Sequence, residues 1–188
     1  MPHAFVGLDR ITDDIYSEGM KSGYRLFIMP ILVACIFFLA PPARAQGQID
    51  GIAHLTLPNG KTVNADWLRV LLVRTQAEVP AFPNLAAMEP FEQMEAVRNL
   101  HMQFFINVRQ KMSDPDYVIR STLTTPDGTF RFADIPPGPY FILVTFPAMI
   151  QDYKVAWQVP VTARDHQAVF IELNQDNLAV PTYSRQKD

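Results

Sequence analysis

The chain beyond residue 45 alternates between apolar and polar positions in short stretches that are separated by turn residues. Between residues 48 and 57 every second side chain is small or apolar. A period of two residues predicts a strand with one buried face. Asn59-Gly60 then forms a turn signal, because both residues tolerate a positive φ angle. Residues 67–75 are apolar on both faces, which predicts a second strand that is covered on both sides.

The same pattern predicts five further strands, at residues 117–125, 129–132, 140–146, 155–161 and 168–173. The strand at 140–146 is apolar on both faces and should be central in its sheet. Pro160 cannot donate a ladder hydrogen bond, which places 155–161 at a sheet edge. Several short strands with turn signals between them predict a mainly β fold, a β-sandwich. Residues 178–188 are polar and are predicted to form a flexible tail.

Residues 76–114 interrupt the strand pattern. Their first part is a loop punctuated by prolines, and their second part predicts an amphipathic helix over about residues 90–112. Pro90 suits the first helical position, where its missing N–H has no partner to lose. At helical spacing, one apolar stripe contains Met94, Val97, His101, Phe104, Phe105, Val108 and Met112. Met102 and Ile106 lie off this stripe, so we expect them to form a small exposed apolar patch that could contact a partner.

Residues 121–144 read STLTTPDGTFRFADIPPGPYFILV and resemble the carboxypeptidase regulatory-like domains. The residues that carry the resemblance are Thr125, Asp127, Gly128, Phe130, Phe132, Pro136, Pro137, Gly138 and Tyr140. The resemblance implies a Greek-key, prealbumin-like (transthyretin-like) β-sandwich of about seven strands over residues 46–177. The helix-containing segment 76–114 would then be an insertion. That family is grouped with carbohydrate-binding-like folds, and its members serve as accessory, adhesive or folding-support modules.

An uncharged apolar run of 15 residues precedes this region, at residues 26–40. It is shorter than the roughly 20 apolar residues of a membrane-spanning helix. Lys21 and Arg25 lie on its amino side, and Ala43-Arg44-Ala45 follows on its carboxyl side. A positive region, an apolar region and a small-x-small site in this order are typical of a secretory signal peptide, here residues 20–45.

We predict cleavage after Ala45 and a periplasmic or secreted mature chain. Residues 1–19 form an unusual extension ahead of a signal, so Met20 is interpreted as the true start. Two alternatives stay open for the apolar run. It could remain uncleaved as an amino-terminal anchor, or Cys35 could be lipidated, since Leu32 to Cys35 resembles a lipobox. Contact with the membrane is expected only under these alternatives.

The residues beyond 45 carry no recognisable catalytic or metal-binding motif, so we predict a non-enzyme without a cofactor. The sole cysteine, Cys35, lies in the predicted signal peptide. His54, His101 and His166 are far apart in sequence, and His101 is interpreted as a buried, hydrogen-bonded side chain. The net charge of −3 provides no basic field for nucleic acid. Two acid pairs are interpreted as helix punctuation and a solvated helical turn, namely Asp114/Asp116 and Glu92/Glu95.

These observations favour a non-catalytic exported module that binds or supports a protein of the envelope or the secreted fraction. Met102 and Ile106 are the candidate partner surface. The alternative is a carbohydrate-binding module, which needs exposed aromatic rings that stack on sugars. Trp67 and Tyr153 are the candidate sugar platform, since both fall at strand ends or in loops. Two other aromatic residues alternate inward and are interpreted as core, Tyr140 and Trp157.

Overall fold

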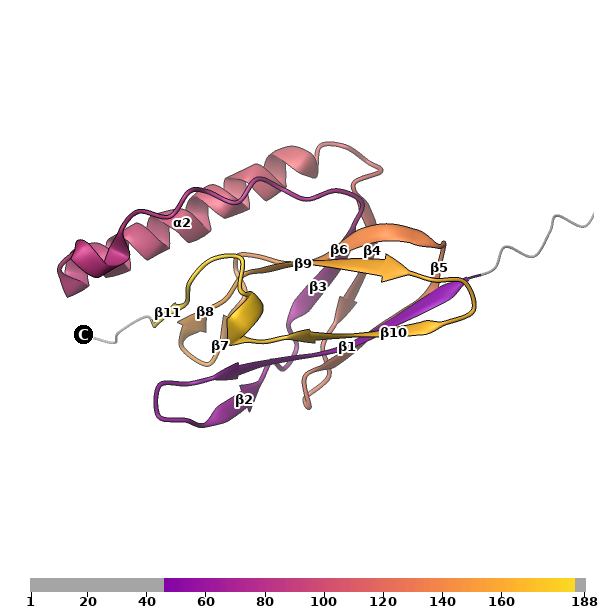
Figure 1. Ribbon diagram of the computed structural model, residues 1–188, viewed down its shortest axis with the longest axis horizontal. Helices are drawn as coiled ribbons and strands as arrows, with labels where there is room; N and C mark the ends of the chain where they lie inside the picture. Colours follow the sequence, from indigo (N-terminus) through magenta and orange to yellow (C-terminus); the bar gives the residue numbers. More distant parts are fainter. Residues whose placement is uncertain (1–45, 185–188) are drawn as a thin grey trace, which may run out of the picture. The chain divides into compact units, whose positions relative to one another are not determined.

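The computed structural model describes residues 46–184, which form a β-sandwich with one long helix (Figure 1). The predicted signal peptide at 20–45, the extension at 1–19 and the candidate lipidation site Cys35 lie outside the described residues. Within 46–184, no helix combines the length and the apolar composition that a membrane crossing requires.

Two four-stranded sheets make the sandwich. In the first sheet, β1 lies between β10, which runs parallel to it, and the antiparallel strands β5 and β2. Their bounds are β1 Gly47–Thr56, β2 Thr62–Asn64, β5 Thr129–Ile135 and β10 Ala168–Leu173. The second sheet has the order β4-β3-β6-β9 and is antiparallel. Its strands are β3 Arg69–Val73, β4 Val118–Leu123, β6 Gly138–Val144 and β9 Trp157–Ala163.

The strand pattern of the sequence is confirmed in this arrangement. Seven strands have five residues or more, which agrees with the predicted number. β6 is central in its sheet, and β9, which carries Pro160, is an edge strand. Ile49, Ala53 and Leu55 of β1 are buried between the sheets as the period of two predicts. Trp157 is fully buried in the same core, so its interpretation as a core residue is correct.

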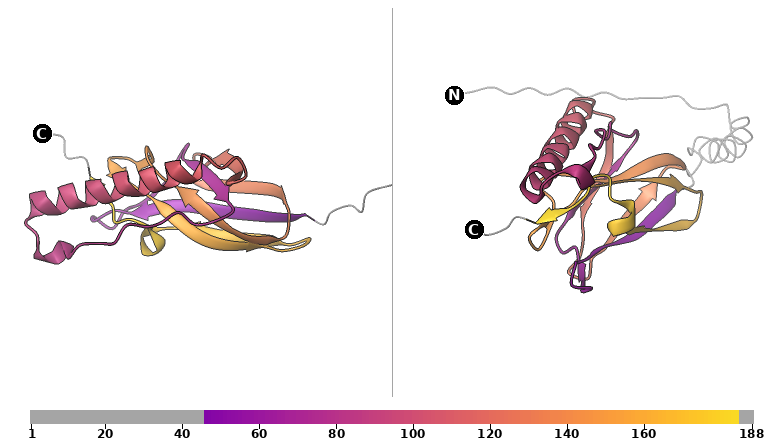
Figure 2. Two further views of the ribbon diagram at one scale, coloured as in Figure 1. Left: turned by 90° about the horizontal axis from the view of Figure 1, so that it is seen from above. Right: turned by 60° about the vertical axis from the view of Figure 1, so that its left-hand side comes forward.

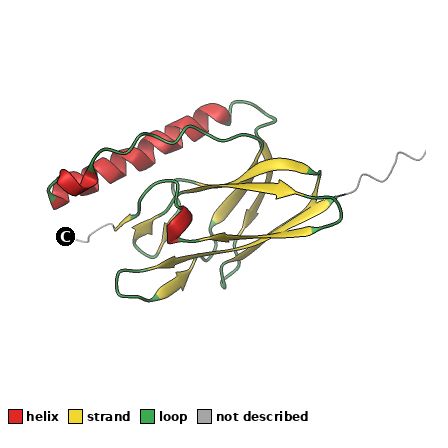
Figure 3. Ribbon diagram, viewed as in Figure 1, coloured by secondary structure: helices red, strands yellow, loops and turns green. Residues whose placement is uncertain are grey.

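The helix α2 (Pro90–Lys111) adds a third layer on the outer face of the second sheet (Figure 2). The short helix η1 (Leu85–Ala87) precedes it in the connecting loop (Figure 3). Alternate residues of β3 explain why that strand is apolar on both faces. Val70 and Leu72 face the core between the sheets, whereas Leu71 and Val73 face α2. The helix contributes Leu100, Phe104 and Val108 to this second core.

A small third sheet lies under the amino-terminal half of α2 (Figure 1). It consists of β7 (Met149–Ile150), β8 (Tyr153–Lys154) and β11 (Tyr183–Ser184). The short helix η2 (Gln175–Asn177) connects β10 to this region. Val180 is fully buried in the core beneath α2. The prediction of a flexible tail is therefore wrong for residues 178–184, because this segment supplies both a strand and a core side chain.

Two further predictions need correction. The buried face of α2 contains Leu100, which the predicted stripe omitted, and leaves Met112 exposed. The apolar arc of this helix is wider than the face that the sheet covers, so periodicity alone could not position the contact. The predicted strand at 67–75 begins only at Arg69, because Trp67 has a positive φ of 52° and lies in a turn.

Candidate binding surface beside the long helix

The face of α2 that points away from the sandwich carries large apolar side chains. Phe91 is 69% exposed, Met102 46% and Ile106 40%. Ten large hydrophobic residues are exposed within residues 46–184, and six of them belong to the segment 76–114. These six are Val79, Phe82, Phe91, Met102, Ile106 and Met112. Contiguous exposed apolar surface marks an interaction site more often than single exposed residues do.

A groove of about 450 Å³ lies between the carboxyl-terminal half of α2 and the connection between β6 and β7. We call it the helix groove. Its aromatic side chains are Trp67, Phe105 and Phe146, and the ring centroids of Phe105 and Phe146 are 5.3 Å apart. Met112 and Met149 add flexible apolar groups. The helix groove therefore offers aromatic and thioether surface in a concave setting, which is the usual form of a ligand site.

A second groove of about 700 Å³ follows the amino-terminal half of α2 and is called the upper groove. Phe91, Met94 and Met102 line it from the helix, and Tyr183 lines it from β11. Phe146 lines both grooves, so the two hollows meet at this side chain. Ile106 lines neither groove and lies on the exposed helix surface next to them.

Basic side chains outnumber acidic ones along the two grooves. Arg69 and Arg109 line the helix groove together with Asp66. Among residues 46–184, neither of these arginines has a carboxylate within ion-pair distance. The Arg109 guanidinium lies 6.0 Å from the centre of the Phe105 ring, a cation–π contact. The helix groove thus holds two arginines against one aspartate, and neither arginine forms an ion pair with a carboxylate of the described chain.

The upper groove is also lined by charged side chains. Its charged side chains are Glu95, Arg98 and Lys154. The Glu95 carboxylate pairs with Arg98 at 2.9 Å, an i,i+3 contact on the helix. Lys154 Nζ lies 5.0 Å from the centre of the Phe146 ring. Lys154 of β8 contacts the ring of Phe146 and Arg109 of α2 contacts the ring of Phe105, so the two cation–π contacts come from different elements.

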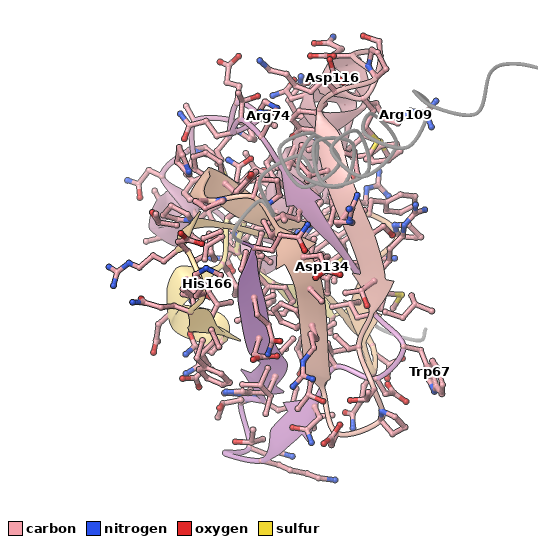
Figure 4. The ribbon with its side chains drawn as sticks, turned by 90° about the vertical axis from the view of Figure 1, so that its right-hand side faces the viewer. Trp67, Arg74, Arg109, Asp116, Asp134 and His166 are labelled. Atoms are coloured by element: carbon pink, nitrogen blue, oxygen red, sulfur yellow. The ribbon has the colours of Figure 1, made fainter. Side chains whose placement is uncertain are left out.

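Trp67 presents its indole to the helix groove from a turn before β3. The side chain is 66% exposed, and its backbone has the left-handed conformation that a bulky residue rarely adopts. Figure 4 shows Trp67 projecting outward on the same side of the view as Arg109, whereas His166 lies on the opposite side. A left-handed backbone at a bulky residue costs about 1–3 kcal/mol and occurs preferentially at functional sites. Trp67 is therefore the most unusual side chain of this surface.

Tyr153 does not join Trp67. It is half-buried in β8, packs against the core between the sheets and lines neither groove. Tyr140, interpreted from the sequence as a core residue, is buried, and its hydroxyl donates to the carbonyl of Pro136 at 2.9 Å. The two residues of the predicted sugar platform therefore lie in different surroundings.

The histidines and acid pairs take structural positions. His101 is buried, and its Nε2 donates to the Pro181 carbonyl at 2.8 Å. His54 Nε2 lies 2.6 Å from a Glu172 carboxylate oxygen on the outer face of the first sheet. The Asp114 carboxylate accepts the backbone N–H of Asp116 at 2.9 Å, as expected of helix punctuation. In the described part of the chain, no three or more histidine, cysteine or acidic side chains form a group that could hold a metal ion.

Burial lowers the pKa of His101, and the nearby charge of Lys154 lowers it further, while the hydrogen bond to Pro181 raises it. On the outer face of the first sheet, burial alone would raise the pKa of Asp50. Hydrogen bonds from Gln48 and Arg131 outweigh that effect and lower it. Hydrogen bonding to His54 lowers the pKa of Glu172. None of these groups lines the helix groove or the upper groove.

The sequence did not indicate Phe146, Arg69 or Arg109 as members of a site. Phe146 follows β6 and precedes Pro147, so it reads simply as the end of an apolar strand. Arg69 and Arg109 are 40 positions apart in the chain and line one groove only because α2 packs on β3. A useful signal was available at Phe146-Pro147, since a residue before proline marks a turn or an exposed end of a strand.

Comparison with known proteins reveals a distant likeness of fold. No model of a protein family matches the sequence, and no curated protein matches it. A minor pilin of Streptococcus agalactiae matches at 11% identity and a TM-score of 0.42, over 77% of this chain and 48% of the pilin. A candidate carbohydrate-binding protein of Pseudomonas aeruginosa matches at 18% identity and a TM-score of 0.41, over 73% and 93%. The pilus backbone protein of Streptococcus pneumoniae matches at 8% identity and a TM-score of 0.35, over 68% and 40%.

This chain spans about half the length of the Streptococcus agalactiae pilin. At these identities and TM-scores the likeness concerns β-rich folds and extends to neither ligand nor partner. The sheets and cores described above establish the architecture itself: the chain is a mainly β sandwich with one helix packed on its outer face.

Proposed function

We propose that this chain is an exported, non-catalytic module that binds a protein partner through the outer surface of α2. The concentration of exposed apolar residues on the segment 76–114 carries this proposal. The two grooves beside α2 add concave apolar surface to the same side of the molecule. Export follows from the signal-like segment 20–45, and the sandwich is proposed to be of the carboxypeptidase regulatory-like, prealbumin-like type from the pattern in 121–144.

The experiment uses substitutions in place of removal of the helix. Removing 76–114 would also remove Leu100, Phe104 and Val108 from the core on the second sheet, so a loss of binding could follow from unfolding. Met102→Glu with Ile106→Glu changes only exposed positions. Leu123→Glu with Phe170→Glu is the matched control, because these apolar side chains are 52% and 66% exposed and line neither groove.

The tagged full chain and both double variants are incubated with envelope extract of the source organism, and captured proteins are quantified by mass spectrometry. We expect one specific partner, reduced at least about tenfold for the Met102/Ile106 variant and unchanged for the control, since a tenfold loss corresponds to about 1.4 kcal/mol. A photo-crosslinking residue at position 106 should attach to that same partner. Equal capture by all three proteins, or no specific capture, would refute the proposal.

A carbohydrate ligand is the second candidate, and Trp67 is the observation that favours it. Its exposed indole lies in the helix groove beside Asp66 and Arg69, which could hydrogen-bond sugar hydroxyls. A glycan array should then show binding that Trp67→Ala abolishes. Tryptophan fluorescence is a direct readout, because the only other tryptophan, Trp157, is fully buried. An array without any bound glycan removes this candidate.

A further inference from the structure

We propose that the helix groove binds a linear peptide segment of the partner, with apolar side chains in the groove and carboxylates facing Arg69 and Arg109. This inference rests on the proposed function and specifies its partner. It follows from three properties of the groove: its apolar lining, its net positive charge and the adaptability of its methionine side chains.

The apolar lining of the groove favours the apolar side chains of a peptide over a sugar or the flat surface of a folded protein. The exposed indole of Trp67 and the Phe105–Phe146 ring pair all line the groove. A concave site of about 450 Å³ accommodates one or a few side chains of a peptide.

The positive charge of the groove predicts that the charged groups of the peptide are negative. Two arginines line the helix groove, Arg69 and Arg109, against one acidic side chain, Asp66. Glu95 is already paired with Arg98, whereas Arg69 and Arg109 have no carboxylate within ion-pair distance in the described chain. Planar guanidinium groups bind carboxylates with paired hydrogen bonds. An acidic peptide would therefore supply the missing counter-charge.

The same charge argues against a second copy of this surface as the occupant. Two copies placed face to face would bring the basic excess of each against the other. Like charges across an interface oppose association. A partner from outside this surface, carrying negative charge, avoids that repulsion.

Methionine side chains make the groove adaptable. Met112 and Met149 line the helix groove, and Met94 and Met102 line the upper groove. Unbranched thioether side chains change rotamer easily and fit differently shaped apolar groups. We therefore expect the site to accept several related peptides and to prefer a composition, apolar with acidic residues, over one fixed sequence.

The test is selection of a phage-displayed library of random linear peptides on the full chain. Selected peptides are synthesised, and their binding is followed by Trp67 fluorescence and titration calorimetry. Arg69→Glu/Arg109→Glu reverses the charge of the groove. Arg120→Glu/Arg164→Glu makes the same change of net charge at exposed positions outside both grooves and serves as the control. Circular dichroism and thermal melting establish that both variants fold.

We expect peptides that combine apolar residues with Asp or Glu and lose at least about tenfold in affinity on the Arg69/Arg109 variant, a loss of about 1.4 kcal/mol. The control should bind them unchanged, and selection on the reversed groove should yield Lys or Arg in place of the acids. Basic or uncharged peptides on the native groove, or acidic peptides insensitive to the reversal, overturn the inference.

Two outcomes separate this inference from the proposed function. If envelope capture depends on Met102 and Ile106 but no groove-dependent peptide is selected, the peptide inference is refuted and the proposed protein partner is retained. Phosphatidylglycerol vesicles are tested in parallel. Binding to them that the Arg69/Arg109 reversal abolishes, again without selected peptides, would show that the basic aromatic surface recognises a membrane and would overturn the inference as well.

Discussion

Buried polar side chains lie where α2 meets the segments that pack beneath it. His101 donates to the Pro181 carbonyl and contacts the edge of the Tyr183 ring at a centroid distance of 5.4 Å. These contacts tie residues 180–184 to the helix. The polar groups of this layer therefore position the carboxyl-terminal segment that forms one side of the upper groove.

His101 should make the stability of the fold dependent on pH. Burial holds its folded-state pKa below the value of about 6.5 expected for the unfolded chain. The unfolded chain then binds more protons, so the free energy of unfolding falls as the pH drops through about 6.5. His101→Gln keeps an N–H donor without titrating and should flatten this dependence. Urea unfolding at several pH values measures it; equal slopes for both proteins would contradict the prediction.

Tyr117 carries a buried hydroxyl without a hydrogen-bond partner among the described residues. Burial raises its pKa to about 12. Removing an unsatisfied hydroxyl breaks no hydrogen bond and relieves the cost of burying a polar group. Tyr117→Phe should therefore leave the free energy of unfolding unchanged or raise it by up to about 1 kcal/mol. Chemical denaturation of both proteins provides the measurement. A loss of more than about 1 kcal/mol would mean that the hydroxyl has a partner in solution.

At the scale of elements, the turn between β4 and β5, which belong to different sheets, shows how local chemistry directs the chain from one sheet to the other. The Gly128 N–H donates to the Thr125 carbonyl at 2.9 Å and closes the predicted turn. Hydrogen bonds from the hydroxyls of Thr125 and Thr129 lower the pKa of the exposed Asp127 carboxyl. The turn fixes the position of Phe130, which points into the core as its alternation predicts.

Gly128 and Gly60 provide a matched pair of substitutions, because both have a φ of 81°. An alanine Cβ at Gly60 would meet no atom within 4 Å, so Gly60→Ala should cost only the left-handed backbone, about 1–2 kcal/mol. At Gly128 it would lie 2.5 Å from the Ala53 carbonyl oxygen. Gly128→Ala should therefore destabilise by about 1–3 kcal/mol more, measured by thermal or urea unfolding. Equal losses would show that this contact relaxes freely.

At the scale of the whole molecule, α2 serves two surfaces. Leu100, Phe104 and Val108 bury the outer face of the second sheet, and Met102 and Ile106 remain exposed. The helix is thus a structural layer that also displays apolar surface. Stability and binding should respond to different substitutions on it.

Phe104→Ala tests the structural role of the helix. Phe104 is fully buried, so its truncation should lower the free energy of unfolding by about 3–5 kcal/mol. Ile106→Ala, two residues away and 40% exposed, should change it by no more than about 0.5 kcal/mol. Urea denaturation of the two variants is the measurement. Similar effects of both changes would mean that α2 does not pack on the sheet as described.

The sequence by itself determined the β-sandwich, the turn at 125–128 and the beginning of α2 at Pro90. These features depend on local periods and on residues such as proline and glycine, whose backbone preferences act without long-range contacts. The sequence also indicated that Met102 and Ile106 are exposed. It placed Trp67 in a strand, however, and assigned it to one sugar platform with Tyr153.

Only the tertiary structure decided which part of the wide apolar arc of α2 is covered, that residues 178–184 pack, and that Arg69, Arg109 and Phe146 line one groove. These facts depend on contacts between residues far apart in the chain. The second sheet contacts only part of the apolar arc of α2, so the uncovered remainder, with its methionines and aromatic rings, became the candidate binding surface.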